Sequence, residues 1–268
     1  MDYNTISWTV TSGVGTLTLN RPERRNDMSH EMAAETYELL RHVEQDDSIA
    51  VVVVTGAQRW FCAGGDIADL SAEEKDPFAK EENFTVPVLL HRMAQVTIAA
   101  INGACAGAGL GWACACDLRY AAREARFNTA FLDVAVAGDM GLPWTLPRIV
   151  GSGVARELSL LPRKLDADEA AELKLVNGVF DSDALLPEVN ARASRLAAAD
   201  PLARRTLKAN YTDAENMSFS DFIRIETERH ADIVSGPACQ EAFRALLAPK
   251  SSNADVRPPV LNDAVGEL

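Results

Sequence analysis

Two stretches of small residues follow apolar, strand-like segments and could together hold a negatively charged oxygen. The first reads Phe61-Cys62-Ala63-Gly64-Gly65-Asp66, and the second, from Asn102 to Gly111, is rich in glycine and alanine. Small residues let the backbone approach a ligand closely. If the second stretch opens a helix near Gly107, its first N–H groups lack partners within the helix and point outward at the positive end of the helix dipole. Such amides favour an oxygen on which negative charge develops.

A single carboxylate stands among apolar neighbours further along the chain. Asp139 follows Val136-Ala137-Gly138 and precedes Met140, Leu142 and Trp144. A free aspartate with a pKa of about 3.9 is a weak base at neutral pH, but desolvation raises that pKa into a more useful range. A desolvated carboxylate of this kind could act as a general base. The alternative interpretation of Asp139 is a turn residue or helix N-cap.

The segments that must position these groups alternate between strand and helix patterns. The alternation from Trp8 to Leu19 predicts a hairpin, and helical spacing after Ser29, a candidate N-cap, predicts a helix to Val43. Runs at 50–55, 97–102, 117–122 and 176–180 have strand character, and residues 71–82 read as a polar helix. Asp166 and Glu169 form a capping-box pattern. Strands that alternate with helices predict an α/β core.

The pattern changes to helices alone after residue 183. Four helical segments are expected at 185–199, 202–214, 218–234 and 238–248. We therefore expect a core over residues 1–200, a helical part over 201–250 and a loosely ordered tail over 251–268.

Composition excludes several classes of function. The net charge of −13 and the lack of a basic stripe argue against nucleic-acid binding. Apolar runs end well before the length of about 18 residues that a membrane span needs. The start of the chain lacks a secretory signal, so a cytoplasmic protein is expected. Five cysteines, mostly in apolar segments, and four scattered histidines predict neither a disulfide framework nor a metal site.

The order and spacing of these motifs resemble the crotonase, or enoyl-CoA hydratase/isomerase, superfamily. Its F-x-A/S-G-x-D loop, A-A-x-N-G-x-x-x-G-G-G segment and following C-D correspond to residues 61–66, 99–109 and 116–117. The likeness extends to Leu19-Asn20-Arg21-Pro22 and to residues 146–151, so it spans about residues 5 to 250. It implies an α/β fold built as a crotonase-like spiral of ββα turns, with a helical C-terminal part used for trimerisation in a homotrimer or homohexamer.

The resemblance also assigns roles to individual residues. The peptide N–H groups of Ala63 and Ala108 would form an oxyanion hole for the thioester carbonyl of an acyl-CoA substrate. No metal or redox cofactor is implied, since the CoA thioester is the substrate. Residues with an implied part in binding CoA or the acyl group are Arg24, Arg25, Gly65, Asp66, Ile67, Phe131 and, beside the adenine of a neighbouring subunit, Phe243.

Two departures from the family pattern bear on the reaction. Family hydratases use two glutamates to activate water, and the corresponding positions here are Gly111 and Phe131. Neither side chain can move a proton. Asp139 instead aligns with the aspartate of ring-epoxide, enoyl-CoA and dienoyl-CoA isomerases, and with the nucleophile of 4-chlorobenzoyl-CoA dehalogenases. The resemblance therefore favours an isomerase-like reaction that uses Asp139.

Three other functions stay open from the sequence. The first is a hydratase or lyase that positions water in an unusual way. The second is a hydrolase or dehalogenase-like reaction through an ester on Asp139. The third is an acyl-CoA-binding homologue without catalysis.

Overall fold

The computed structural model describes residues 2–72 and 77–248. Contacts divide the chain into two units, Met1–Phe222 and Ile223–Leu268.

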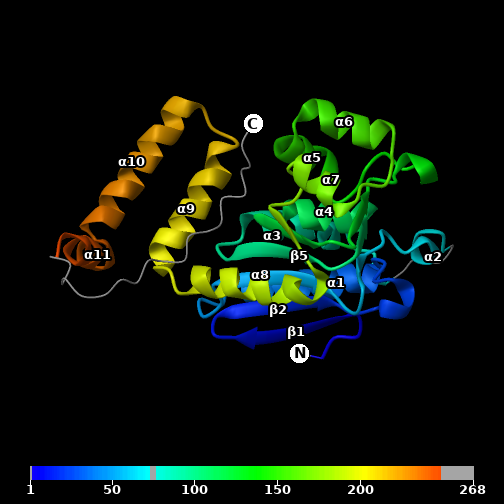
Figure 1. The fold of residues 1–268 in the computed structure, drawn as a ribbon, viewed down its shortest axis with the longest axis horizontal. Coiled ribbons are helices and arrows are strands. Elements are labelled where there is room, and N and C mark those ends of the chain that lie inside the picture. The colour runs from blue at the N-terminus through cyan, green and yellow to red at the C-terminus, as the bar shows by residue number, and fades with distance from the viewer. Residues whose placement is uncertain (1, 73–76, 249–268) are drawn as a thin grey trace. The chain divides into compact units, whose positions relative to one another are not determined.

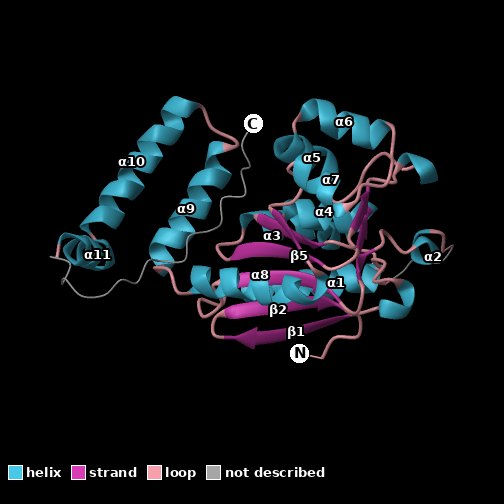
Figure 2. Ribbon diagram, in the orientation of Figure 1, coloured by secondary structure: helices cyan, strands magenta, loops and turns pink. Residues whose placement is uncertain are grey.

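A six-stranded sheet forms the base of the first unit (Figure 2). Its order is β1-β2-β3-β5-β7-β9, with β1 antiparallel to β2 and all other neighbours parallel. All residues of β3 and β5 are buried, which explains why both segments are apolar without alternation. The strands are Ile6–Thr11 (β1), Val14–Leu19 (β2), Val51–Gly56 (β3), Val96–Ile101 (β5), Leu118–Ala122 (β7) and Gly178–Phe180 (β9).

A second, smaller sheet is formed by the chain segments that follow three strands of the large sheet. It contains the short parallel strands β4 (Trp60–Cys62), β6 (Ala104–Ala106) and β8 (Arg126–Asn128), in the order β4-β6-β8. Each of them follows a strand of the large sheet after a connection of two or three residues. The chain therefore repeats one unit of a long strand, a sharp corner and a short strand.

The side chain of Asn102 joins two of these corners. Its Nδ2 donates to the carbonyl oxygens of Gly56 at 2.7 Å and Gln58 at 2.8 Å, and its Oδ1 accepts from the Gly56 N–H at 3.1 Å. A Cβ on Gly103 would lie 1.9 Å from the carbonyl oxygen of Arg59, so only glycine fits at the second corner. These bonds set the two short strands β4 and β6 side by side.

Helices cover both faces of the large sheet. Helix α8 packs Leu185, Val189 and Ala193 against β3 and β5, whereas α1, α3 and α4 belong to the core on the opposite face. Every residue of α4 is buried. The helices of the first unit are His30–Val43 (α1), Ile67–Leu70 (α2), Val86–Arg92 (α3), Gly107–Ala115 (α4), Leu142–Val150 (α5), Ser152–Leu160 (α6), Ala167–Glu172 (α7), Ser182–Ala197 (α8) and Pro201–Ala214 (α9), with 3-10 turns at Pro22–Arg24 (η1), Glu81–Thr85 (η2) and Leu132–Val134 (η3).

The local sequence signals match these elements closely. The Ser29 hydroxyl caps α1 by accepting from the Met32 N–H, and the Asp166 carboxylate caps α7 by accepting from the Glu169 N–H. The hairpin, the buried strands and the helix that opens at Gly107 are confirmed. The helix expected over 71–82 is wrong at residues 71, 72 and 77–80, which are not helical, because α2 ends at Leu70; Glu81 and Glu82 begin the 3-10 turn η2.

Helix α9 is fixed to the core by a buried ion pair. The Lys208 ammonium lies 2.7 Å from the Asp117 carboxylate and donates to the Gln95 carbonyl oxygen at 2.8 Å. Asp117 also accepts from the Thr97 N–H at 2.7 Å. Contacts therefore group α9 with the first unit, whereas the sequence division placed residues 201–250 together.

Two helices, α10 (Phe219–Ser235) and α11 (Pro237–Leu247), carry the chain into and through the second unit (Figure 1). Both match predicted segments. Leu246 and Leu247 are more than four-fifths exposed in the single chain. The predicted tail over 251–268 lies outside the described residues. None of the helices in the described ranges is both long and apolar enough to cross a membrane.

Replacement of Lys208 by methionine tests the ion pair that holds α9. The change leaves the Asp117 carboxylate without its partner, so we expect the free energy of unfolding to fall by about 3 kcal/mol. Urea unfolding of Lys208→Met measures this. Lys164→Met, at an exposed position, is the matched control and should change stability little. A Lys208→Met protein as stable as wild type would contradict a structural role for the pair.

Candidate active site

The loop after β4 is held along one edge by the turn that precedes α1. The N–H of Ala63 donates to the carbonyl oxygen of Arg25 at 3.2 Å, and the N–H of Met28 donates to the carbonyl oxygen of Gly64 at 2.7 Å. The N–H of Asp66 in turn donates to the carbonyl oxygen of Met28 at 2.8 Å. This loop is therefore a short continuation of the small sheet rather than a free segment.

These bonds decide which amide of the loop is available to a ligand. The N–H of Ala63 is already engaged, which does not fit the oxyanion-hole role expected of it. The Gly64 carbonyl and the Gly65 N–H belong to one trans peptide, so they point in opposite directions. Since that carbonyl faces Met28, the Gly65 N–H faces away from it. Within the described ranges, no hydrogen bond takes up the Gly65 N–H.

Helix α4 packs against this loop. A Cβ on Gly109 would lie 2.6 Å from the Cys62 Cβ and 2.7 Å from the Cys62 carbonyl oxygen, so helix and strand touch through glycine. A Cβ on Gly107 would lie 3.7 Å from the Gly64 Cα. The two loops that the sequence singled out are therefore neighbours in the structure.

The beginning of α4 supplies a second amide. Ala108 lies in the first turn of the helix, where N–H groups have no partner within the helix, and no side chain of the described residues caps this end. Gly107, immediately before it, has a φ of 48°, a conformation that glycine adopts without strain. The partial positive charge of the helix end adds to the attraction for a negative oxygen.

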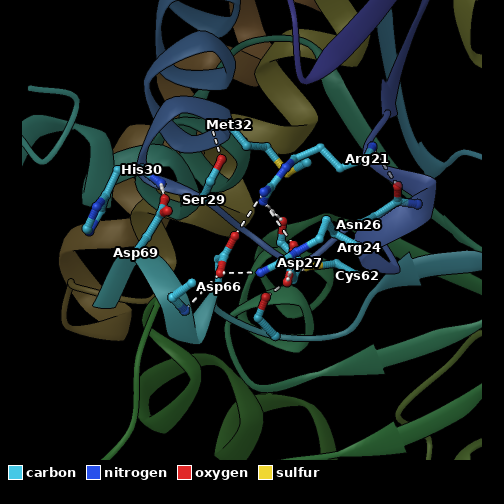
Figure 3. Close-up of polar contacts among 12 residues, drawn as sticks. Arg21, Arg24, Asn26, Asp27, Ser29, His30, Met32, Cys62, Asp66 and Asp69 are labelled. Carbon is cyan, nitrogen blue, oxygen red and sulfur yellow. Dashed lines mark hydrogen bonds and ion pairs between the residues drawn. The ribbon is translucent and has the colours of Figure 1, made fainter. Parts of the chain in front are cut away.

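Four charged side chains lock the first loop in place (Figure 3). Arg21 and Arg24 donate to the two carboxylate oxygens of Asp66, each at 2.9 Å, and Arg21 also pairs with Asp27 at 2.9 Å. Asp66 additionally caps α2 by accepting from the Ala68 N–H at 3.0 Å. Burial tends to raise the pKa of Asp66, but the hydrogen bonds from Arg21 and Ala68 and the two arginine charges outweigh it and lower that pKa.

The pKa of Asp27 shifts in the opposite direction. Burial and the neighbouring Asp66 charge raise its pKa above the ordinary value, although Arg21 and Arg24 work against the rise.

The structural role of Arg21, Asn26 and Asp27 was not predicted. Asn26 is fully buried and donates to the carbonyl oxygens of Ala57 and Trp60 at 3.2 and 2.8 Å. The only available signal was their place in and after the Asn-Arg-Pro motif.

The residues predicted to contact CoA lie in different surroundings. Arg24 points to Asp66, whereas the exposed Arg25 guanidinium lies 5.6 Å from the centre of the Trp60 ring. Ile67 begins α2 with 68% of its side chain exposed. Phe243 lies on α11 in the second unit and is 43% exposed. No structural observation assigns Arg24, Arg25 or Phe243 to a ligand.

Asp139 lies on a tight loop between η3 and α5. Gly138, Met140 and Gly141 all have positive φ, of 111°, 47° and 71°. The Met140 N–H donates to the Asp139 carboxylate at 2.7 Å and holds it in one orientation. Burial raises the pKa of Asp139 above its ordinary value, and the bond from Met140 only partly offsets this. Within the described residues, no cation pairs with this carboxylate.

The loop that carries Asp139 packs directly on α4. A Cβ on Gly111 would lie 2.6 Å from the Met140 Cβ, 2.9 Å from the Met140 carbonyl oxygen and 3.3 Å from the Asp139 carbonyl oxygen. Gly111 and Ala108 are three residues apart and so share one face of the helix. The backbone of Asp139 therefore rests on α4 one turn beyond Ala108.

Phe131 lies close to the same helix end. Its Cε1 atom would be 3.7 Å from a Cβ on Gly107. The side chain therefore provides an apolar wall beside the first amides of α4. Asp133, the other acid near this position, is exposed on η3 and lies away from the buried surface of α4. No group of three or more potential metal-ligating side chains occurs in the part of the chain that the structure describes.

Comparisons with known proteins identify the family of this chain. The family model described as enoyl-CoA hydratase/isomerase matches residues 9–248. The chain is 35% identical to 1,2-epoxyphenylacetyl-CoA isomerase of Escherichia coli over 250 residues, which cover 90% of this chain and 95% of that protein. It is 37% identical to 4-chlorobenzoyl coenzyme A dehalogenase-1 of an Arthrobacter species, over 70% of this chain and 71% of that one.

A solved structure shows the same architecture. The crystal structure of an enoyl-CoA hydratase subunit from Geobacillus kaustophilus superimposes with a TM-score of 0.85 at 28% identity, covering 92% of this chain and 96% of that one. The two-sheet α/β core and the helical C-terminal region are thus those of the crotonase fold. The chain is an acyl-CoA enzyme of the enoyl-CoA hydratase/isomerase, or crotonase, superfamily.

Proposed function

We propose that this enzyme moves a double bond in an acyl-CoA thioester, with Asp139 as its single proton-transfer group. The observation that carries the proposal is the packing on α4: the loop that holds the unpaired Gly65 amide touches the helix end that holds the unpaired Ala108 amide, and the backbone that carries the desolvated Asp139 carboxylate rests on the helix at Gly111. Amides of this kind stabilise the enolate oxygen that forms when a proton leaves the carbon next to a thioester.

The proposed reaction needs no water and no second acid. Asp139 removes a proton from Cα of a β,γ-unsaturated thioester, and the electron pair left on Cα is delocalised onto the thioester oxygen and through the double bond to Cγ, as a dienolate. The N–H groups of Gly65 and Ala108 hold that oxygen. The protonated Asp139 then delivers its proton to Cγ, which leaves an α,β-unsaturated thioester and an ionised carboxylate. A raised pKa makes Asp139 effective in both steps.

Hydration by two glutamates is disfavoured by packing at Gly111. The position that carries one of those glutamates in family hydratases has no space for a side chain here, because Met140 and Asp139 backbone occupies it. Phe131 occupies the other position. A reaction that uses one carboxylate is therefore favoured. The homotrimer or homohexamer implied by the family and the role of Phe243 beside a neighbouring adenine remain proposals.

Asp139→Asn is the primary test. With trans-3-hexenoyl-CoA in deuterated water, NMR of the wild type should show conversion to the 2-enoyl isomer without added oxygen. The variant keeps the size of the side chain but cannot accept the proton, so we expect kcat to fall by about 10²- to 10⁴-fold. Addition of water to the product would indicate a hydratase instead. A covalent adduct on Asp139 in a quenched reaction would indicate nucleophilic, dehalogenase-like chemistry.

The raised pKa of Asp139 predicts a pH-dependent cost in stability. A carboxyl whose pKa is higher in the folded state binds more protons there, so the wild type loses stability as pH rises from the unfolded pKa of about 3.9 through the raised folded value. Asp139→Asn lacks this loss. Its Tm should therefore exceed that of wild type at pH 7, and the difference should vanish at low pH. Asp133→Asn, on the exposed turn, is the control. An equal Tm for Asp139→Asn and wild type at pH 7 would contradict desolvation of Asp139.

Gly111→Ala tests whether packing on α4 places the carboxylate. The added methyl group must push Met140, and hence Asp139, away from the helix. A displacement of about 1 Å at a catalytic group can lower kcat by roughly 100-fold, and we expect KM to change much less. Gly153→Ala on α6, where a Cβ meets open space, is the control and should keep full activity. Wild-type kcat in Gly111→Ala would show that this contact does not position Asp139.

A further inference from the structure

A cavity of about 510 Å³ lies between α5, α6 and the segment that leads to Asp139. Helices α5 and α6 pack against each other (Figure 1), and residues 131–138 close the third side. The volume is within the range of pockets that hold small molecules. Neither the proposed proton transfer nor the folding of the core accounts for an opening of this size.

The inner end of the cavity reaches the candidate active site. Phe131 lines the cavity and also lies beside Gly107 at the beginning of α4. Gly138 and Leu142, two further lining residues, flank Asp139, and the Leu142 N–H donates to the Asp139 carbonyl oxygen at 3.0 Å. Leu142 is almost fully buried, whereas Leu160 on the other side is 64% exposed. The cavity thus extends from the carboxylate loop towards solvent.

The walls of the cavity differ in chemistry. Helix α5 contributes leucines and prolines, which give an apolar wall. Helix α6 contributes Ser152, Arg156 and Ser159, whose spacing of four and three residues places them on one helix face. Among the described lining residues, Arg156 is the only charged one. Its guanidinium has no ion-pair or hydrogen-bond partner within residues 2–72 and 77–248.

We propose that this cavity holds the acyl group of the substrate and that Arg156 binds a carboxylate at its far end. The inference rests on the proposed function, because it takes the thioester to lie at the Gly65 and Ala108 amides. The substrate class is then the monothioester of an unsaturated dicarboxylic acid. An apolar chain packs on Phe131 and α5, and the terminal carboxylate meets the unpaired guanidinium beside two hydroxyl groups. An arginine fork matches a carboxylate with two parallel hydrogen bonds.

Two substrates of equal length test the proposal. The CoA monothioester of 3-octenedioic acid carries the terminal carboxylate, and 3-octenoyl-CoA ends in a methyl group. We expect wild-type kcat/KM to favour the diacid by about tenfold, the factor that one charge-assisted hydrogen bond of moderate strength supplies. Arg156→Ala should remove this preference by lowering kcat/KM for the diacid alone. Arg195→Ala, an exposed arginine on α8 outside the cavity, should retain it.

A second variant tests the cavity without removing charge. Ser159→Phe fills part of the space from the α6 side, and its half-buried position limits damage to the core. It should raise KM for both eight-carbon thioesters much more than for 3-butenoyl-CoA, because the short acyl group does not reach α6; an equal change for all three thioesters would contradict the proposal.

The possible failures are distinguishable. Equal kcat/KM for diacid and monoacid in the wild type, or a preference that survives Arg156→Ala, overturns the cavity proposal and leaves isomerisation standing. If neither thioester is turned over, the proposed function fails. Calorimetric binding of the same two thioesters then decides the cavity proposal: tighter binding of the diacid that depends on Arg156 supports it, and equal binding overturns it.

Discussion

The close approach of helix α4 to strand β4 is the constraint on which the site depends. Helix and strand meet where Gly109 faces Cys62, at a distance that excludes even a methyl group. Any larger residue would separate the loop after β4 from the first turn of α4, and their two free amides could no longer act on one oxygen. The corners tied by Asn102 serve this contact, because they hold β4 and β6 in the small sheet beside each other.

In the proposed mechanism, the same helix links recognition of the thioester to the placement of the carboxylate. Its first turn presents an amide, and its next turn offers a bare backbone at Gly111 against which the Asp139 loop rests. A side chain at position 111 and the present loop cannot coexist. The absence of a glutamate at position 111 and the position of the Asp139 loop therefore depend on the same packing contact.

Most elements of the core could be predicted because their signals are local. Ser29 caps a helix with regular apolar spacing, and β3 and β5 are long enough to show continuous apolar character. The strands of the small sheet have only three residues each and carry no usable period. Helix α5 was not predicted, since Pro143 and Pro147 argue against a helix. The unpaired N–H of this loop belongs to Gly65 and not to Ala63. This depends on the direction of one peptide plane, which follows from pairing with Met28, 37 positions away by residue number.

Because Arg21 and Arg24 are both paired with Asp66, a phosphate group would gain less binding free energy at this surface than it would from a free arginine. Arg24 is half-exposed, yet its charge is already shared with Asp66 and Asp27. An anion that binds Arg24 exchanges one partner for another, so its net affinity reflects the difference between two ion pairs. Asp66 would meanwhile keep Arg21 and its hydrogen bond to α2. An anion at Arg24 would thus leave the loop with its own anchor, and the Arg24–Asp66 pair could form again once that anion has left.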